Sequence, residues 1–243
     1  MSNAVWQAIW WGGFAAFSLI LGYFLATRHL SNRIIGIVMG IGAGALISAI
    51  AYELVPESVL TGPDVLLAFG LGALAFFFGD WIIDRRGGAD RKDIAGKQTS
   101  GSGAAIFVGT LLDNVPESII LGMGLGTGGA INIAFLASVF ISNLPEGVAG
   151  SINLEAAGYA RRRIFWMWVI LVMLSAASAG LGFLIIYTLP GAQGIYAQAF
   201  AAGAMLTMLA DAMMPEAFEH GGILVGLFTV LGFLMSATLS VLQ

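Results

Sequence analysis

Two similar polar motifs stand inside apolar stretches of this sequence. DNVPES occupies Asp113–Ser118, and SNLPEG follows at Ser142–Gly147, with each matched position 29 residues further along. Both motifs combine carboxylate, amide or hydroxyl oxygens with a proline. Oxygen ligands of this kind suit hard or borderline divalent cations such as Mg²⁺, Mn²⁺, Fe²⁺ or carboxylate-bound Zn²⁺. The motifs therefore predict a metal site.

The spacing within each motif predicts a shared face on a helix. Residues three and four positions apart lie one above the other, so the first two polar residues of each motif lie near its glutamate. Each proline removes a backbone hydrogen bond and bends its helix. The predicted metal ligands are Asp113, Asn114, Glu117, Ser142, Asn143 and Glu146.

The composition places these motifs in a membrane protein. The chain has 243 residues, of which 58% are hydrophobic and 10% are charged, far from the roughly 25% charged residues of soluble domains. A helix needs about 20 apolar residues to cross a bilayer. The sequence predicts an all-α protein with eight transmembrane helices, in a 3+2+3 arrangement. We place the helices at 5–27, 33–60, 63–84, 102–126, 130–153, 164–189, 193–218 and 221–242.

The motif offset of 29 residues equals one span and a short turn. We therefore expect the fourth and fifth spans to form a tight antiparallel pair, with both motifs at middle depth and facing each other. An ionisable residue inside a span is by default a candidate for function. Glycine clusters at 40–44 and 122–126 are interpreted as close packing between helices, because small residues let membrane helices approach one another.

The basic residues predict the orientation. With eight spans, all ten Lys and Arg residues fall into loops 28–33, 85–97 and 161–163, which lie on one side. The positive-inside rule makes that side cytoplasmic and both termini extracytoplasmic. We expect one transmembrane transporter domain over residues 1–243, in the cell (inner) membrane, with a flexible cytoplasmic loop at 85–101.

Two weaker motifs extend the pattern across the bilayer. Glu53 and Glu57 belong to YELVPES near the predicted outer face, and Asp211 and Glu216 belong to DAMMPEAFEH near the inner face. These four acids could extend a chain of oxygen sites from the central pair. For Glu57 and Glu216, as for Glu219, an equally good alternative is a helix-end acid hydrated at the interface. His29 and His220 are expected to be interfacial histidines rather than ligands.

At these motifs the chain resembles the ZIP (Zrt-/Irt-like) metal transporters, especially bacterial members. The paired motifs carry the resemblance, together with YELVPES and GAMLTMLADAMMPEAFEHGG (Gly203–Gly222). It implies passage of divalent metal through a central site on spans four and five. The family usually has a strong ligand such as histidine where this chain has Asp113 and Ser142, and often His–Glu where it has Asp211–Ala212. The sixth span, at SAASAGLG, also lacks the acid that forms a second site in many members. These departures favour harder ions and one central ion.

Three functions remain open from the sequence. The first is a transporter of divalent cations (the Zn²⁺, Mn²⁺ or Fe²⁺ class), for which the metal is the substrate and no organic cofactor is needed. The second is an intramembrane hydrolase, in which Glu146 would be the base for Ser142. The third is a degenerate ZIP-like scaffold or metal sensor. We favour the first and expect no enzyme activity. The expected partners are the lipid bilayer and the cation but no nucleic acid, and a homodimer stays open.

Overall fold

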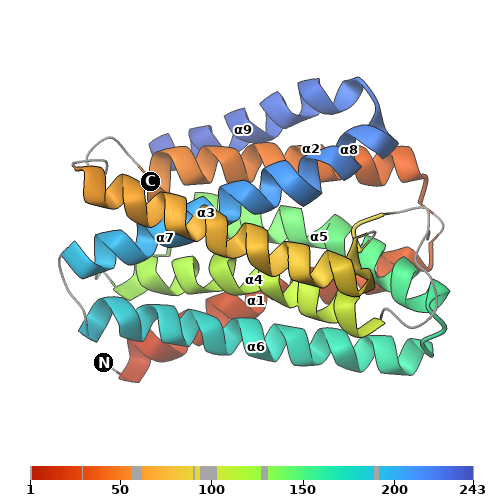
Figure 1. The fold of residues 1–243 in the computed structure, drawn as a ribbon, viewed down its shortest axis with the longest axis horizontal. Coiled ribbons are helices and arrows are strands. Elements are labelled where there is room, and N and C mark those ends of the chain that lie inside the picture. Colours follow the sequence, from red (N-terminus) through yellow and green to blue (C-terminus); the bar gives the residue numbers. More distant parts are fainter. Residues whose placement is uncertain are drawn as a thin grey trace.

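The protein is an elongated bundle of helices (Figure 1). The computed structural model describes residues 2–28, 30–55, 62–89, 91–93, 103–126, 131–188 and 192–242. Its helices are α1 (Ser2–Ala26), α2 (Asn32–Ala49), α3 (Pro63–Ile83), α4 (Gly103–Gly126), α5 (Ile133–Ala156), α6 (Arg161–Thr188), α7 (Ala192–Met208), α8 (Met214–Gly221) and α9 (Leu224–Leu242). Three π-helical segments extend or join them: η1 (Ile50–Leu54), η2 (Asp84–Gly88) and η3 (Leu209–Met213).

Within the described residues, eight helical stretches are long and apolar enough to cross a membrane. η1 continues α2, η2 continues α3, and η3 joins α7 to α8 in a single stretch. The protein is therefore a multi-pass membrane protein, and the predicted number of spans is confirmed. The second span ends at Leu54 rather than at residue 60, and Glu57 and His29 lie outside the described residues.

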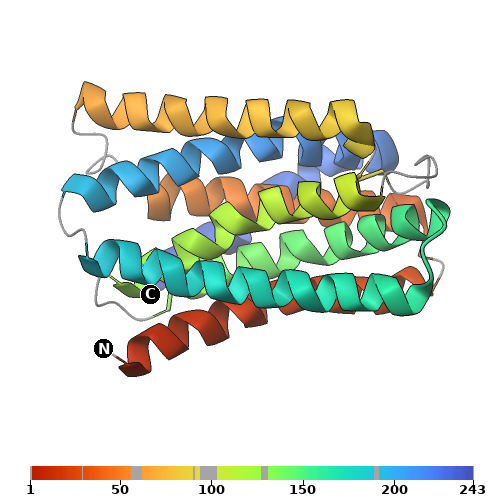
Figure 2. The same ribbon diagram turned by 60° about the horizontal axis from the view of Figure 1, so that its bottom comes forward.

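The ends of the bundle agree with the predicted topology. Both termini lie at one end of the long axis, at the left in Figure 1. The connections after α1, α3 and α5, where the basic residues gather, lie at the opposite end (Figures 1 and 2). We call these the terminal end and the basic end. That the basic end is cytoplasmic remains a prediction.

The motif helices have different main neighbours. α4 packs chiefly on α6, α5 packs chiefly on α1 and α2, and the contact between α4 and α5 is smaller. The expected tight pair is thus a looser one, because α1, α2 and α6 supply most of the surface that the two helices bury. The 3+2+3 arrangement remains a prediction.

Glycine allows the close approaches, as expected. A methyl group on Gly122 of α4 would overlap the backbone carbonyl of Ala179 on α6. Gly22 of α1 and Gly147 of α5 face each other in the same way, since a methyl group on either would collide with the backbone of the other helix. Gly147 ends the second motif, so this approach helps to fix the position of that motif.

Candidate metal centre

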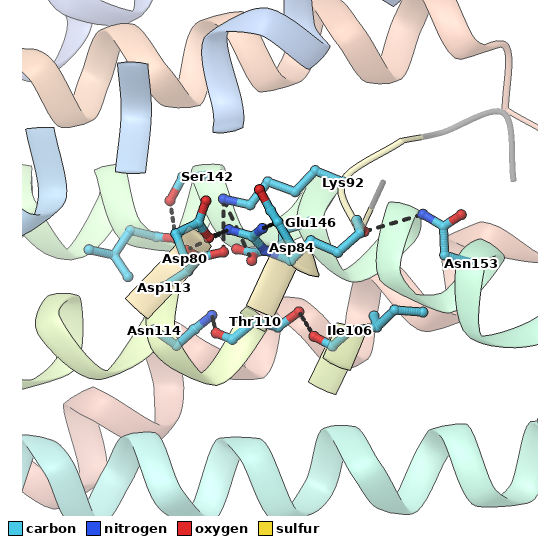
Figure 3. A network of polar contacts seen from close by, with 12 residues as sticks. Asp80, Asp84, Lys92, Ile106, Thr110, Asp113, Asn114, Ser142, Glu146 and Asn153 are labelled. Carbon is cyan, nitrogen blue, oxygen red and sulfur yellow. Dashed lines mark hydrogen bonds and ion pairs between the residues drawn. The ribbon is translucent and has the colours of Figure 1, made fainter. Parts of the chain in front are cut away.

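The two motifs converge in the middle of the bundle. All six predicted ligands, Asp113, Asn114, Glu117, Ser142, Asn143 and Glu146, are buried. Figure 3 shows Asp113 of α4 and Glu146 and Ser142 of α5 around one cluster. Glu117 also interacts electrostatically with Glu146 and Asp113. The structure thus brings carboxylates from both motifs together, as the offset of 29 residues predicts.

Two basic side chains from the connection after α3 reach into this cluster. The Lys92 Nζ atom lies 2.9 Å from Asp113 Oδ2 and 3.9 Å from Glu146 Oε1. The Arg91 guanidinium contacts Asp80, and lies 3.3 Å from Asp84 Oδ1 and 3.5 Å from Asp113 Oδ1. Only 4% of the Lys92 side chain is exposed. Both residues belong to the predicted loop at 85–101, and the sequence gives no expectation of their burial.

Both basic residues keep their charge. Burial lowers the pKa of Lys92, but attraction by Asp113 and Glu146 outweighs burial and raises that pKa above its ordinary value. Burial likewise lowers the pKa of Arg91, but attraction by Asp113 and Asp80 outweighs burial, so the pKa is raised above its ordinary value. Lys92 and Arg91 therefore act as fixed positive charges beside the carboxylates.

Local structure holds these two residues inside. Gly87 in η2 has φ +94°, a conformation that glycine adopts readily, and it turns the chain after α3. The Asn153 side chain of α5 then donates hydrogen bonds to the backbone oxygens of Arg91 at 3.2 Å and Asp93 at 2.6 Å. The predicted loop at 85–101 thus begins with helical η2 and buried residues 91–93. Residue 90 and residues 94–101 lie outside the described residues, so the flexibility of the loop stays a prediction.

The cluster holds more acids than bases. Among the described residues, the two buried cations Arg91 and Lys92 interact with five acidic side chains: Asp80, Asp84, Asp113, Glu117 and Glu146. With every group ionised, the acids exceed the cations by three charges. Buried charge without compensation is strongly unfavourable. A divalent cation, or protonation of some of the acids, would reduce this excess.

Several of its oxygen atoms are also free to bind an ion. Glu117 Oε2, Asn114 Oδ1 and both polar atoms of the Asn143 amide are buried and make no hydrogen bond within the part of the chain that the structure describes. Asn114 donates its side-chain nitrogen to the Thr110 carbonyl at 3.0 Å. The Ser142 hydroxyl donates to the Val139 carbonyl at 2.9 Å. Both donor groups thus bond to carbonyls of their own helices, so the Asn114 Oδ1 and Ser142 Oγ atoms keep lone pairs that can bind a cation.

The predicted pathway residues lie on either side of this centre. Towards the terminal end, Glu53 accepts a hydrogen bond from Asn132, which also caps α5 at the Phe135 amide, and both line a cavity of about 50 Å³. Towards the basic end, Asp211 and Glu216 line a cavity of about 60 Å³ together with Lys92. Glu57, the fourth predicted pathway residue, lies outside the described residues.

The π-helical segments coincide with these acids. η1 contains Glu53, η2 contains Asp84 and η3 contains Asp211. π-Helical turns widen a helix and are frequent at functional sites. The hydropathy pattern does not predict these turns. Asp80, in contrast, could have been recognised as an acid inside the third apolar span.

Comparison with known proteins gives one informative relative. No protein-family model matches the chain. The zinc transporter ZIP11 of Bos taurus is 33% identical over 147 residues, which cover 57% of this chain. The matched region spans 42% of that relative, less than half of its length. This similarity agrees with the family resemblance of the paired motifs and supports a proposal about the function of this chain.

Proposed function

We propose that this protein is a ZIP-type transporter of divalent cations of the Zn²⁺, Mn²⁺ or Fe²⁺ class. The observation that carries the proposal is the convergence of two motif copies into one buried, oxygen-lined cluster in which acidic side chains outnumber basic ones. The zinc transporter of cattle with 33% identity supports the choice of cargo. The ion is bound by the six motif residues and moves between the cavities at Glu53 and at Asp211.

The chemistry of the cluster favours an ion of harder character than a histidine-rich site would. Carboxylate and amide oxygens suit harder ions such as Mn²⁺, whereas imidazole nitrogens favour Zn²⁺. Asp113 and Ser142 stand where the resembled family usually has stronger ligands. With these weaker ligands the centre binds the ion with lower affinity, so the ion can dissociate again, as transport requires.

Lys92 takes part in this cycle as a competitor. Its ammonium shares Asp113 and Glu146 with the incoming ion, so the two cations exclude each other from these carboxylates. An ion arriving from the terminal end first meets Glu117 and Asn143, whose Oε2 and Oδ1 atoms make no hydrogen bond among the described residues. Full coordination then requires Lys92 to withdraw toward the basic end, where it already lines the cavity with Asp211.

The test is cation uptake into proteoliposomes containing the purified full-length chain. Glu117→Ala and Glu146→Ala each remove a carboxylate of the centre and are expected to abolish uptake of Zn²⁺ and Mn²⁺. Glu155→Ala is the matched control, because Glu155 lies on the same helix as Glu146 with 56% of its side chain exposed. Uptake by either centre variant at the control rate would overturn the proposal.

One observation favours a second candidate, a ZIP-like scaffold that has lost transport. Arg91 and Lys92 already form ion pairs where a metal ion would bind, and such pairs could replace the ion permanently. This candidate predicts no uptake by the unmodified protein and no specific binding of divalent ions at the centre. The hydrolase alternative is less well supported, since Ser142 donates to Val139 rather than to Glu146.

A further inference from the structure

A second group of potential ligands lies at the basic end of the bundle, apart from the six motif residues. Asp93, Glu219 and His220 each offer one ligand atom, and these three atoms lie within 4.8 Å of one another. Glu216 adds a third carboxylate and a fourth side chain, with Oε2 at 3.2 Å from His220 Nε2. We call these four residues the basic-end cluster. Asp93 comes from the connection after α3, and the other three come from α8.

His220 is unusual for a histidine near a helix end. Only 8% of its side chain is exposed, and its Nε2 atom makes no hydrogen bond within the described residues. That atom points between carboxylates, at 3.7 Å from Asp93 Oδ2 and 3.2 Å from Glu216 Oε2. The His220 side chain is therefore largely buried rather than solvated, and Asp93 from the connection after α3 lies beside it.

The geometry is that of a small cation site. Metal–ligand bonds of about 2.0–2.2 Å in a tetrahedral shell place neighbouring ligand atoms about 3.4 Å apart, close to the two separations measured here. One imidazole and several carboxylates form a mixed nitrogen and oxygen set, which suits Zn²⁺, Fe²⁺ and Co²⁺ better than Mg²⁺ or Ca²⁺. The central cluster, in contrast, has only oxygen ligands and amide groups.

We propose that Asp93, Glu216, Glu219 and His220 form a second binding site for a transition-metal dication, separate from the central one. The Asn153 side chain donates a hydrogen bond to the Asp93 backbone oxygen at 2.6 Å and so helps to fix the position of Asp93 in the cluster. α8 supplies Glu216 and His220 one helical turn apart, on one face. The proposal concerns binding and does not depend on transport through the centre.

The experiment is Co²⁺ binding to the full-length protein in nanodiscs, followed by visible absorption. The background is Glu117→Ala with Glu146→Ala, which disables the centre. This background is expected to retain one Co²⁺ per chain. Adding His220→Gln is expected to lower the affinity at least about tenfold, since even the loss of a ligand's hydrogen-bond partner costs roughly 10–100-fold. Glu219→Gln, at an exposed position, should weaken binding as well.

The control is His29→Gln, because His29 is the other of the two histidines in the chain. It should leave Co²⁺ affinity and the absorption band unchanged. The inference is overturned if the background binds no Co²⁺, or if neither His220→Gln nor Glu219→Gln weakens binding. These outcomes leave the uptake experiment unaffected, so the site at the basic end and the proposed transport can fail separately.

Discussion

The two copies of the repeated motif share a plan but differ in their partners. In α4, Asp113 is paired with Lys92 and Arg91, and the Asn114 amide donates to Thr110. In α5, the corresponding residue Ser142 donates to the backbone of its own helix, and Asn143 makes no hydrogen bond among the described residues. At these first two positions, the α4 copy is thus more engaged with the rest of the protein than the α5 copy.

This difference separates a structural task from a binding task. Asp113 of the α4 copy forms ion pairs with the two buried cations Arg91 and Lys92. Breaking such a pair leaves an uncompensated charge in the protein interior, which is strongly destabilising. Asn143 of the α5 copy and Glu117 of the α4 copy present oxygens that an ion or water would satisfy. Substitutions in the two copies should therefore act on different properties, which the following predictions use.

The largest expected effect is the loss of Asp113. Asp113→Asn removes the carboxylate that pairs with Lys92 and Arg91, and leaves two buried cations with weaker partners. The free energy of unfolding should fall by about 3–5 kcal/mol, the range for breaking a buried ion pair. Ser142→Ala, at the matching position, should cost about 1 kcal/mol or less, since it removes one neutral hydrogen bond. Tryptophan fluorescence during denaturation in detergent measures both. Equal losses would contradict the division of tasks.

The next effect concerns the competition by Lys92. Lys92→Met keeps the length of the side chain and removes the charge that shares Asp113 and Glu146 with the ion. Affinity of the centre for Mn²⁺ should rise roughly 10–100-fold, which corresponds to the 1.5–3 kcal/mol of a hydrogen bond to a charged group. Titration calorimetry in nanodiscs measures it.

Arg85→Met is the matched control for Lys92→Met. Arg85 belongs to the same connection, but its guanidinium lies 3.8 Å from the centre of the Trp81 ring instead of entering the acid cluster. Its removal should leave Mn²⁺ affinity unchanged. If both variants behave alike, a general effect of net charge explains the result and competition at the centre does not.

The smallest effect compares the two asparagines. Asn114→Leu breaks the hydrogen bond to Thr110 and should destabilise the protein by about 1 kcal/mol. Asn143→Leu removes a buried amide without a hydrogen bond in the described structure, so it should be neutral or stabilising by a similar amount. Thermal unfolding of the two variants measures the difference. Mn²⁺ binding should weaken in both variants. A destabilised Asn143→Leu protein would contradict the view that the Asn143 side chain makes no stabilising hydrogen bond.

The sequence was sufficient for the parts of this protein that depend on periodicity. The hydropathy pattern predicted eight spans, and the motif offset together with the helical repeat predicted that Glu117 and Glu146 meet. Arg91 and Lys92 could not be placed in this way, because the path of a connection depends on particular contacts. Here those contacts are the turn at Gly87 and the hydrogen bonds from Asn153. The burial of His220 could not be predicted for the same reason, since Asp93 of that connection lies beside it.

The roles of the site residues depend on where an ion binds. The most direct test is a crystal structure of the protein soaked in Mn²⁺, with anomalous scattering used to locate the ion. We expect a peak in contact with carboxylate oxygens of Glu117 and Glu146, whatever the occupancy at the basic end. A map with no peak at the centre, while Glu117 is hydrogen-bonded to other side chains and Lys92 remains on Asp113, would contradict the account.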